Sequence, residues 1–289
     1  MRLGGARESG NVEDRRGFGM PGGGMAVGGG CGTVILIILA LVFGLDPRQL
    51  LDSGAGPAQG PPPATQQQQQ RGAQQSDEAG QFVRRVLATT EDVWNEVFKN
   101  NRSQYREPTL VLFTGQVQSA CGRATASVGP FYCPGDEKVY IDLSFFDDLR
   151  SRFRAPGDFA QGYVIAHEVG HHVQNLLGTS DKVTQLQQRA RSEAQSNDLS
   201  VRLELQADCY AGVWGFYAKQ RNILDAGDLE EALGAASAIG DDRLQRESGG
   251  RVVPDSFTHG SSDQRMRWFR AGFDTGDIRR CDTFSTRGL

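Results

Sequence analysis

Apolar residues concentrate in one run near the start of the chain. No charged residue occurs from residue 17 to residue 45, and residues 33–45 are almost entirely aliphatic. With residues 25–32 the run reaches the ~20 residues that a membrane-spanning helix needs. A cleaved signal peptide is the alternative, but its charged leading region would be unusually long and no persuasive cleavage site follows. The pattern therefore predicts an uncleaved transmembrane anchor at residues 25–45.

The segments on both sides of this run are polar. Four arginines lie within the first sixteen residues, whereas only Arg48 follows the run closely. The positive-inside rule then predicts that residues 1–24 form a cytoplasmic N-terminal segment. Residues 46–80 are rich in proline and glutamine, which predicts a disordered linker without a core of its own. We therefore expect a single-pass protein of the cell membrane, with residues 81–289 as an extracytoplasmic domain.

From Phe82 onward the pattern becomes that of a folded domain. Apolar residues recur at helical spacing over residues 82–98 and again over residues 159–176. Between these stretches, residues 110–113 and 138–142 have the apolar and β-branched character of strands. The predicted fold class is α+β, namely a mainly helical domain with a small β-sheet, preceded by one transmembrane helix.

The second helical stretch carries the candidate chemistry. Three of the four histidines of the chain fall within six positions, in the segment His167-Glu168-Val169-Gly170-His171 and the residue after it. Histidines four apart lie on one helix face and can share a zinc ion. Zinc lowers the pKa of a bound water to ~7, and a neighbouring glutamate can take the proton. A chance pentapeptide on a solvated helix is the alternative; the scarcity of histidine and the apolar flanks favour a zinc site.

The ends of this helix can also be predicted. Asp158 is suited to be its N-cap, and Gly178 to stop it at the other end.

A catalytic zinc site needs a third protein ligand and an open position. The longer H-E-x-x-H-x-x-G-x-x-H pattern is excluded, because Gln174 and Leu177 stand where it requires glycine and histidine. Downstream, Glu204 and Asp208 lie four apart in an apolar, helix-like stretch, where buried carboxylates need partners. We predict Glu204 as the third ligand and Asp208 as the acceptor for the free ring N–H of His167. An acidic solvated face is the alternative.

Together, several segments resemble the bacterial neutral zinc metallopeptidases, a membrane-anchored group of gluzincin-type zincins. The resemblance covers about Phe82 to Phe284. It rests on the pentapeptide and on four further segments, which are residues 128–134, 139–143, 204–209 and 259–269. The resemblance implies a zincin-like fold, Zn²⁺ held by His167, His171 and Glu204, Glu168 as general base, and a peptide or protein substrate.

The resemblance also implies roles outside the motif. In gluzincins an imidazole commonly donates a hydrogen bond to the oxyanion that forms during hydrolysis, and His259, in a loop rich in glycine and serine, is the catalytic candidate. The alternative is a structural role beside a helix that Ser262 or Asp263 would cap. His172 lies off the ligand face and is expected to pack or hydrogen-bond. In zincins an edge strand binds extended peptide, and we assign that role to the strand around Val139.

Cysteine usage fits an oxidising location. Cys31 lies in the apolar run and is expected to be a passive small residue, which leaves four cysteines and three possible pairings. We favour Cys121 with Cys133 and Cys209 with Cys281, with free buried thiols as the alternative.

The formal charge of −4 argues against a nucleic-acid surface, and the sequence gives no indication of the oligomeric state. Two functions remain. The first is a membrane-tethered zinc endopeptidase, and the second is a non-catalytic, zinc-stabilised extracytoplasmic module that binds a partner. Glu168 favours the enzyme, because a structural zinc site needs no general base.

Overall fold

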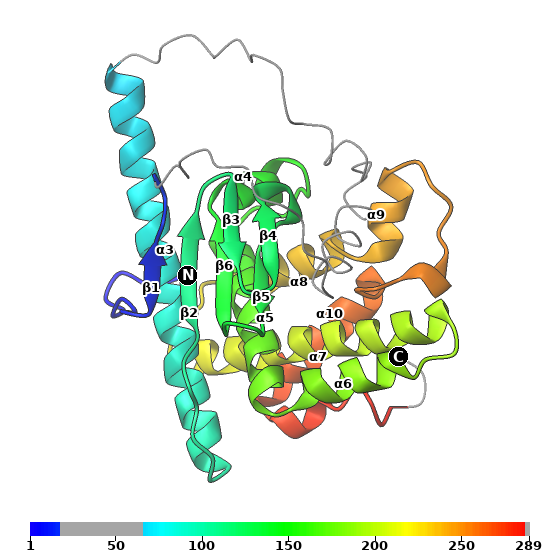
Figure 1. Cartoon of the computed structure of the whole chain (residues 1–289). Coiled ribbons are helices and arrows are strands. Elements are labelled where there is room, and N and C mark those ends of the chain that lie inside the picture. Colours follow the sequence, from blue (N-terminus) through cyan, green and yellow to red (C-terminus); the bar gives the residue numbers. More distant parts are fainter. Residues whose placement is uncertain (18–65, 287–289) are drawn as a thin grey trace.

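The computed structural model describes residues 1–17 and 66–286, with side chains from residue 77 onward in the second range. Helices dominate it and a small sheet lies among them, so the predicted α+β class is confirmed (Figure 1). The α-helices are α3 (Gln66–Asn100), α4 (Ser144–Ser151), α5 (Asp158–Leu176), α6 (Thr179–Gln188), α7 (Glu193–Gln220), α8 (Asp228–Ala238), α9 (Asp241–Glu247) and α10 (Ser262–Thr275). Short 3₁₀ helices are η1 (Ala126–Val128), η2 (Pro254–Ser256) and η3 (Ile278–Cys281).

The main sheet has the strand order β1-β2-β6-β5. Its strands are β1 (Val12–Asp14), β2 (Thr109–Phe113), β5 (Phe131–Cys133) and β6 (Lys138–Asp142), and β3 (Gln116–Ser119) and β4 (Gly122–Thr125) form a separate hairpin. Strands β1, β2 and β6 run parallel, and β5 is antiparallel to β6.

The strand around Val139 is therefore interior to the sheet, and its assignment as the edge strand is wrong. The reason is that residues 131–133, too short to be recognised as a strand, add to its outer side. Among the described strands, β5 ends the sheet on that side.

Side chains on β2 and β6 alternate between two cores, as the period of two in a strand requires. Leu110, Leu112, Val139 and Ile141 enter the main core with α3, α5 and α7. Val111 and Tyr140 face the other way, into a small core with the β3–β4 hairpin. The predicted disulfide Cys121–Cys133 is confirmed and ties that hairpin to β5.

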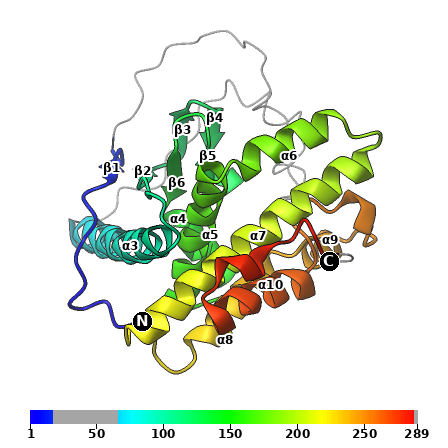
Figure 2. The same cartoon turned by 90° about the horizontal axis from the view of Figure 1, so that it is seen from below.

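Helices α7 and α10 run side by side, as Figure 2 shows, and two glycines let them approach closely. A Cβ atom added at Gly212 would lie 2.0 Å from the carbonyl oxygen of Phe269, and one at Gly272 would lie 1.9 Å from that of Cys209. Only a residue without a side chain fits either position. The predicted disulfide Cys209–Cys281 is also confirmed and fixes the segment after α10 to α7.

Residues 1–17 pack against the same domain. Strand β1 pairs with β2, Arg7 lies 2.7 Å from the buried carboxylate of Glu91, and Lys138 donates to Glu13 across 2.5 Å. The sequence pattern predicted that residues 1–24 are cytoplasmic and that the domain lies on the other side of a membrane. Strands that share a ladder must share a compartment, so this arrangement is wrong. Helix α3 begins at Gln66, inside the stretch predicted to be a disordered linker.

The predicted anchor at residues 25–45, with Cys31, lies outside the described residues. Within the described ranges, no helix has both the length and the apolar character that a bilayer crossing requires. The predicted localisation as a single-pass protein of the cell membrane is contradicted by this finding.

Candidate metal centre

Helix α5 holds the histidine motif in the interior of the domain. His167 is only 6% exposed, and the helix is flanked by α7 and α8. Gly178 adopts a left-handed conformation just after the helix, as predicted. The N-cap is Gly157 rather than Asp158, because the Asp158 carboxylate lies 2.6 Å from the α-amino group of Met1 and accepts no capping hydrogen bond. The local sequence pattern could not predict this contact, because Met1 is far from Asp158 in the sequence.

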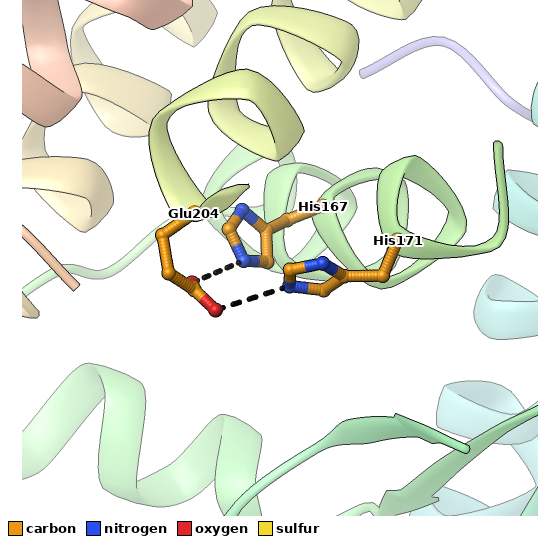
Figure 3. Close-up of side chains that lie close together, drawn as sticks. All are labelled: His167, His171 and Glu204. Carbon is orange, nitrogen blue, oxygen red and sulfur yellow. Dashed lines mark hydrogen bonds and ion pairs between the residues drawn. The ribbon is translucent and has the colours of Figure 1, made fainter. Parts of the chain in front are cut away.

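Three side chains converge from α5 and α7, as Figure 3 shows. The Nε2 atom of His167 lies 3.2 Å from one carboxylate oxygen of Glu204, and Nε2 of His171 lies 3.4 Å from the other. Their ligand atoms all lie within 4.8 Å of one another, so the group could hold one metal ion. The structure thus brings together the three residues that the sequence assigned as ligands.

The Nδ1 atoms of both imidazoles have hydrogen-bond partners on the side away from Glu204. Nδ1 of His167 lies 2.8 Å from Oδ1 of Asp208, and Nδ1 of His171 lies 2.9 Å from Oε1 of Gln174. Both partners are oxygen acceptors, so each Nδ1 carries a hydrogen, and each Nε2 is the nitrogen that a metal would bind in place of a proton. Two such nitrogens and one carboxylate are a donor set that suits zinc. Asp208 lies where the sequence placed it, beside His167.

The carboxylate of Asp208 is held by two further residues that the sequence analysis missed. The Arg265 guanidinium donates to both of its oxygens, each across 2.9 Å, and the Tyr163 hydroxyl donates across 2.6 Å. Arg265 is only 2% exposed. The one available signal was a charged residue at helical spacing with Trp268, Phe269 and Phe273, on the mainly apolar face of α10. Its partner, on α7, could not be read from the sequence.

Charges in the centre favour a shared cation. Burial disfavours a charged imidazole at His167, but Asp208 and Glu204 outweigh burial and raise its pKa to about 10. Burial also opposes ionisation of Glu204, yet His171 and His167 hold the pKa of its carboxyl well below the usual range. A divalent metal would be attracted by the same negative charges that attract a proton here.

Glu168 follows His167 on α5 and is buried. Burial raises the pKa of its carboxyl, and the positive charges of His171 and His167 oppose that rise only in part. A carboxylate with a raised pKa takes up a proton more readily than an ordinary surface glutamate.

His259 lies in the loop before α10, close enough to Glu204 for the charge of that carboxylate to affect its pKa. Its Nδ1 lies 3.3 Å from Oδ1 of Asp241, the first residue of α9. The other oxygen of Asp241 accepts backbone N–H bonds from Thr258, His259 and Gly260, across 2.8, 2.6 and 2.9 Å. Burial disfavours the charged imidazole, but the hydrogen bond to Asp241 and the charges of Glu204 and Asp241 raise the pKa of His259. Asp241, also missed from sequence, thus fixes this loop.

Helix α10 is capped by Ser261, which forms a capping box with Gln264. The alternative considered from the sequence had placed the cap at Ser262 or Asp263. Ser262 instead donates its hydroxyl to Asp242, across 2.8 Å.

His172 joins the motif helix to the edge strand. Its Nδ1 lies 3.0 Å from the Tyr132 hydroxyl on β5, and its Nε2 donates to the carbonyl of Arg106 across 2.6 Å. As the sequence indicated, it hydrogen-bonds rather than joining the group of ligands. This contact fixes β5 relative to His171, the preceding residue of α5.

Known proteins resemble the chain over nearly its whole length. A family model described as "Putative neutral zinc metallopeptidase" matches residues 1–284. "Uncharacterized protein YpfJ" of Escherichia coli is 54% identical over 288 residues, covering 98% of this chain and 99% of that protein. "Uncharacterized protein Rv2575" of Mycobacterium tuberculosis is 47% identical over 224 residues, covering 73% and 74%. No solved structure matches the chain significantly.

Proposed function

The chain belongs to this family of neutral zinc metallopeptidases, and from that premise we propose that it is a zinc-dependent endopeptidase with Glu168 as its general base. The observation that carries the proposal is the convergence of two imidazoles and one carboxylate on one point, with Glu168 beside them on the same helix. The substrate is proposed to be a peptide or protein, and nucleic acid is not expected as a partner.

His167, His171 and Glu204 would hold the zinc ion. Their geometry fits, because both Nε2 atoms and the carboxylate converge on one point, while Asp208 and Gln174 hydrogen-bond to the Nδ1 atoms on the other side of the rings. When bound there, zinc supplies a Lewis acid that polarises the scissile carbonyl and makes water more acidic.

Glu168 is proposed to transfer a proton from the attacking water to the leaving amine. As a buried carboxylate of raised pKa, it takes a proton from the attacking water and then passes it to the leaving amine. The burial that raises its pKa also makes it a better base than a solvated glutamate would be.

His259 is proposed to donate a hydrogen bond to the carbonyl oxygen as negative charge develops on it. Asp241 acts as the positioning residue for this imidazole, through Nδ1 and through the backbone of the loop. A donor that is fixed in advance stabilises developing charge without the cost of reorganising during the reaction.

Strand β5 is proposed to bind the main chain of an extended substrate. It ends the sheet among the described strands, and the Tyr132–His172 hydrogen bond fixes it to the helix of the metal ligands. Main-chain pairing at a sheet edge gives affinity with little dependence on substrate side chains.

The alternative, a zinc-stabilised module that binds a partner, agrees less well with the centre. A structural zinc site is closed by four protein ligands, whereas the group found among the described residues contains three. A three-ligand site leaves a coordination position for water or substrate.

The test uses the whole chain, because residues 1–17 belong to the fold. Zinc content and cleavage of a quenched-fluorescent peptide library are measured for wild type, Glu168→Gln and Glu193→Gln, the last being an exposed control on α7. We expect about one zinc per chain in all three and loss of cleavage only in Glu168→Gln. Zinc without cleavage in wild type would contradict the endopeptidase and favour the module.

A further inference from the structure

Gln174 is a fully buried amide one turn after His171 on α5. Its Oε1 accepts from Nδ1 of His171 across 2.9 Å, and its Nε2 donates to the carbonyl of Leu203 across 2.7 Å and to Oε1 of Gln206 across 3.2 Å. All of its hydrogen-bonding partners belong to the motif helix or to α7.

The orientation of this amide follows from its partners. The Leu203 carbonyl can only accept, so the nitrogen of Gln174 must face α7 and the oxygen must face His171. An oxygen at that place requires the hydrogen of His171 on Nδ1. Gln174 therefore keeps a hydrogen on Nδ1 of His171, so that Nε2, which lies 3.4 Å from Glu204, is the nitrogen left to bind a metal.

Gln206 continues the chain of hydrogen bonds toward the C-terminal segment. It is 7% exposed, and its Nε2 donates to the carbonyl of Cys281 across 2.9 Å, which leaves its oxygen for Gln174. Cys281 is fully buried and is held to α7 by its disulfide with Cys209. The three hydrogen bonds from His171 to the Cys281 carbonyl all point in one direction, so that each polarises the next.

We propose that Gln174 and Gln206 are positioning residues for the His171 ligand, and that the Cys209–Cys281 disulfide raises zinc affinity by holding the carbonyl at the end of this chain. The inference rests on the proposed function, since it requires zinc to bind at His171. It assigns to this disulfide a role that Cys121–Cys133, in the hairpin core, does not have.

The experiment measures the zinc dissociation constant of the full chain by competition with a chromogenic chelator at fixed pH. Gln174→Leu removes the acceptor of His171, and loss of such an outer partner typically weakens metal affinity ~10- to 100-fold. We expect that range for Gln174→Leu and a weakening of about 3- to 10-fold, less than for the direct partner, for Gln206→Leu.

The disulfides supply a matched pair of double variants. We expect Cys209→Ala with Cys281→Ala to weaken zinc binding as much as Gln206→Leu does, and Cys121→Ala with Cys133→Ala to leave it unchanged. Thermal unfolding of each variant, followed by circular dichroism, shows how far it is destabilised. Equal weakening by both double variants, in proportion to lost stability, would overturn the proposal.

A double-mutant cycle shows whether the disulfide acts on zinc binding through Gln206 or only by stabilising the fold as a whole. Removing Cys209–Cys281 in the Gln206→Leu background should weaken zinc binding no further, because the link is already broken. Additive losses of zinc affinity in the combined variant, or no loss of affinity in Gln174→Leu, would overturn the inference. If the wild type still bound zinc, the proposed function would be unaffected. Absence of zinc binding in wild type would overturn both.

Discussion

Arg265→Met should be among the most destabilising single substitutions in the domain. The wild-type guanidinium is buried and donates twice to Asp208 and once, across 3.2 Å, to the Tyr163 hydroxyl. Methionine fills a similar volume without charge, so Asp208 keeps a buried negative charge with only Tyr163 and His167 beside it. Removal of one partner of a buried ion pair costs about 3–5 kcal/mol. For a domain of this size each kcal/mol lowers Tm by about 2–4 °C, which predicts a fall of roughly 6–20 °C.

The assay is urea denaturation in excess chelator, so that zinc binding does not add to the measured stability. Arg267→Met, at an exposed position of the same helix, is the matched control and should change stability by less than about 0.5 kcal/mol. Adding Asp208→Asn to Arg265→Met should recover part of the loss, because the unpaired charge is then gone. A loss below about 1 kcal/mol in Arg265→Met, with unchanged m, would refute the reasoning.

Three further outcomes are expected. Burial raises the pKa of Glu168 above its ordinary 4.5, and a base acts only when ionised, so kcat/KM should fall as pH decreases through a value above 4.5; a pH–rate profile with its acid limb at or below 4.5 would disagree. His259→Ala should lower kcat about 10²- to 10³-fold with zinc content unchanged, as steady-state kinetics and metal analysis can show, whereas unaltered kcat would leave it a structural role. Gly272→Ala should destabilise by more than about 2 kcal/mol through backbone overlap, whereas Gly234→Ala, at an exposed position of α8 where nothing lies within 4 Å, should stabilise that helix by up to about 1 kcal/mol; equal melting temperatures in the two variants would argue against the close packing of α7 and α10.

The parts that sequence predicted well depend on short-range spacing. Residues four apart on a helix share a face whatever the rest of the chain does, so the placing of His167 with His171, and of Glu204 with Asp208, could be anticipated. The strand at residues 138–142 carries its own β-branched pattern and was found with the right bounds.

The parts that sequence missed depend on contacts between distant segments. Arg265 and Asp241 look like ordinary charged residues until α10 and α9 bring them to the centre. Strands β1 and β5 have three residues each and become recognisable only when β2 and β6 pair with them. The predicted localisation was wrong for a related reason. It was inferred from the apolar run alone, whereas the polar residues before that run pair with the domain.

Strand β1 has a consequence for the order in which the protein folds. It is synthesised early, yet Lys138, the partner of Glu13, follows 125 positions later. The main sheet therefore cannot be completed until about half of the chain has left the ribosome, and the outer edge of β2 stays open until residues 12–14 fold back onto it. Exposed strand edges pair readily with other chains. Aggregation during synthesis should therefore depend on how promptly residues 12–14 return to β2, and a protein expressed without them would keep that edge open permanently.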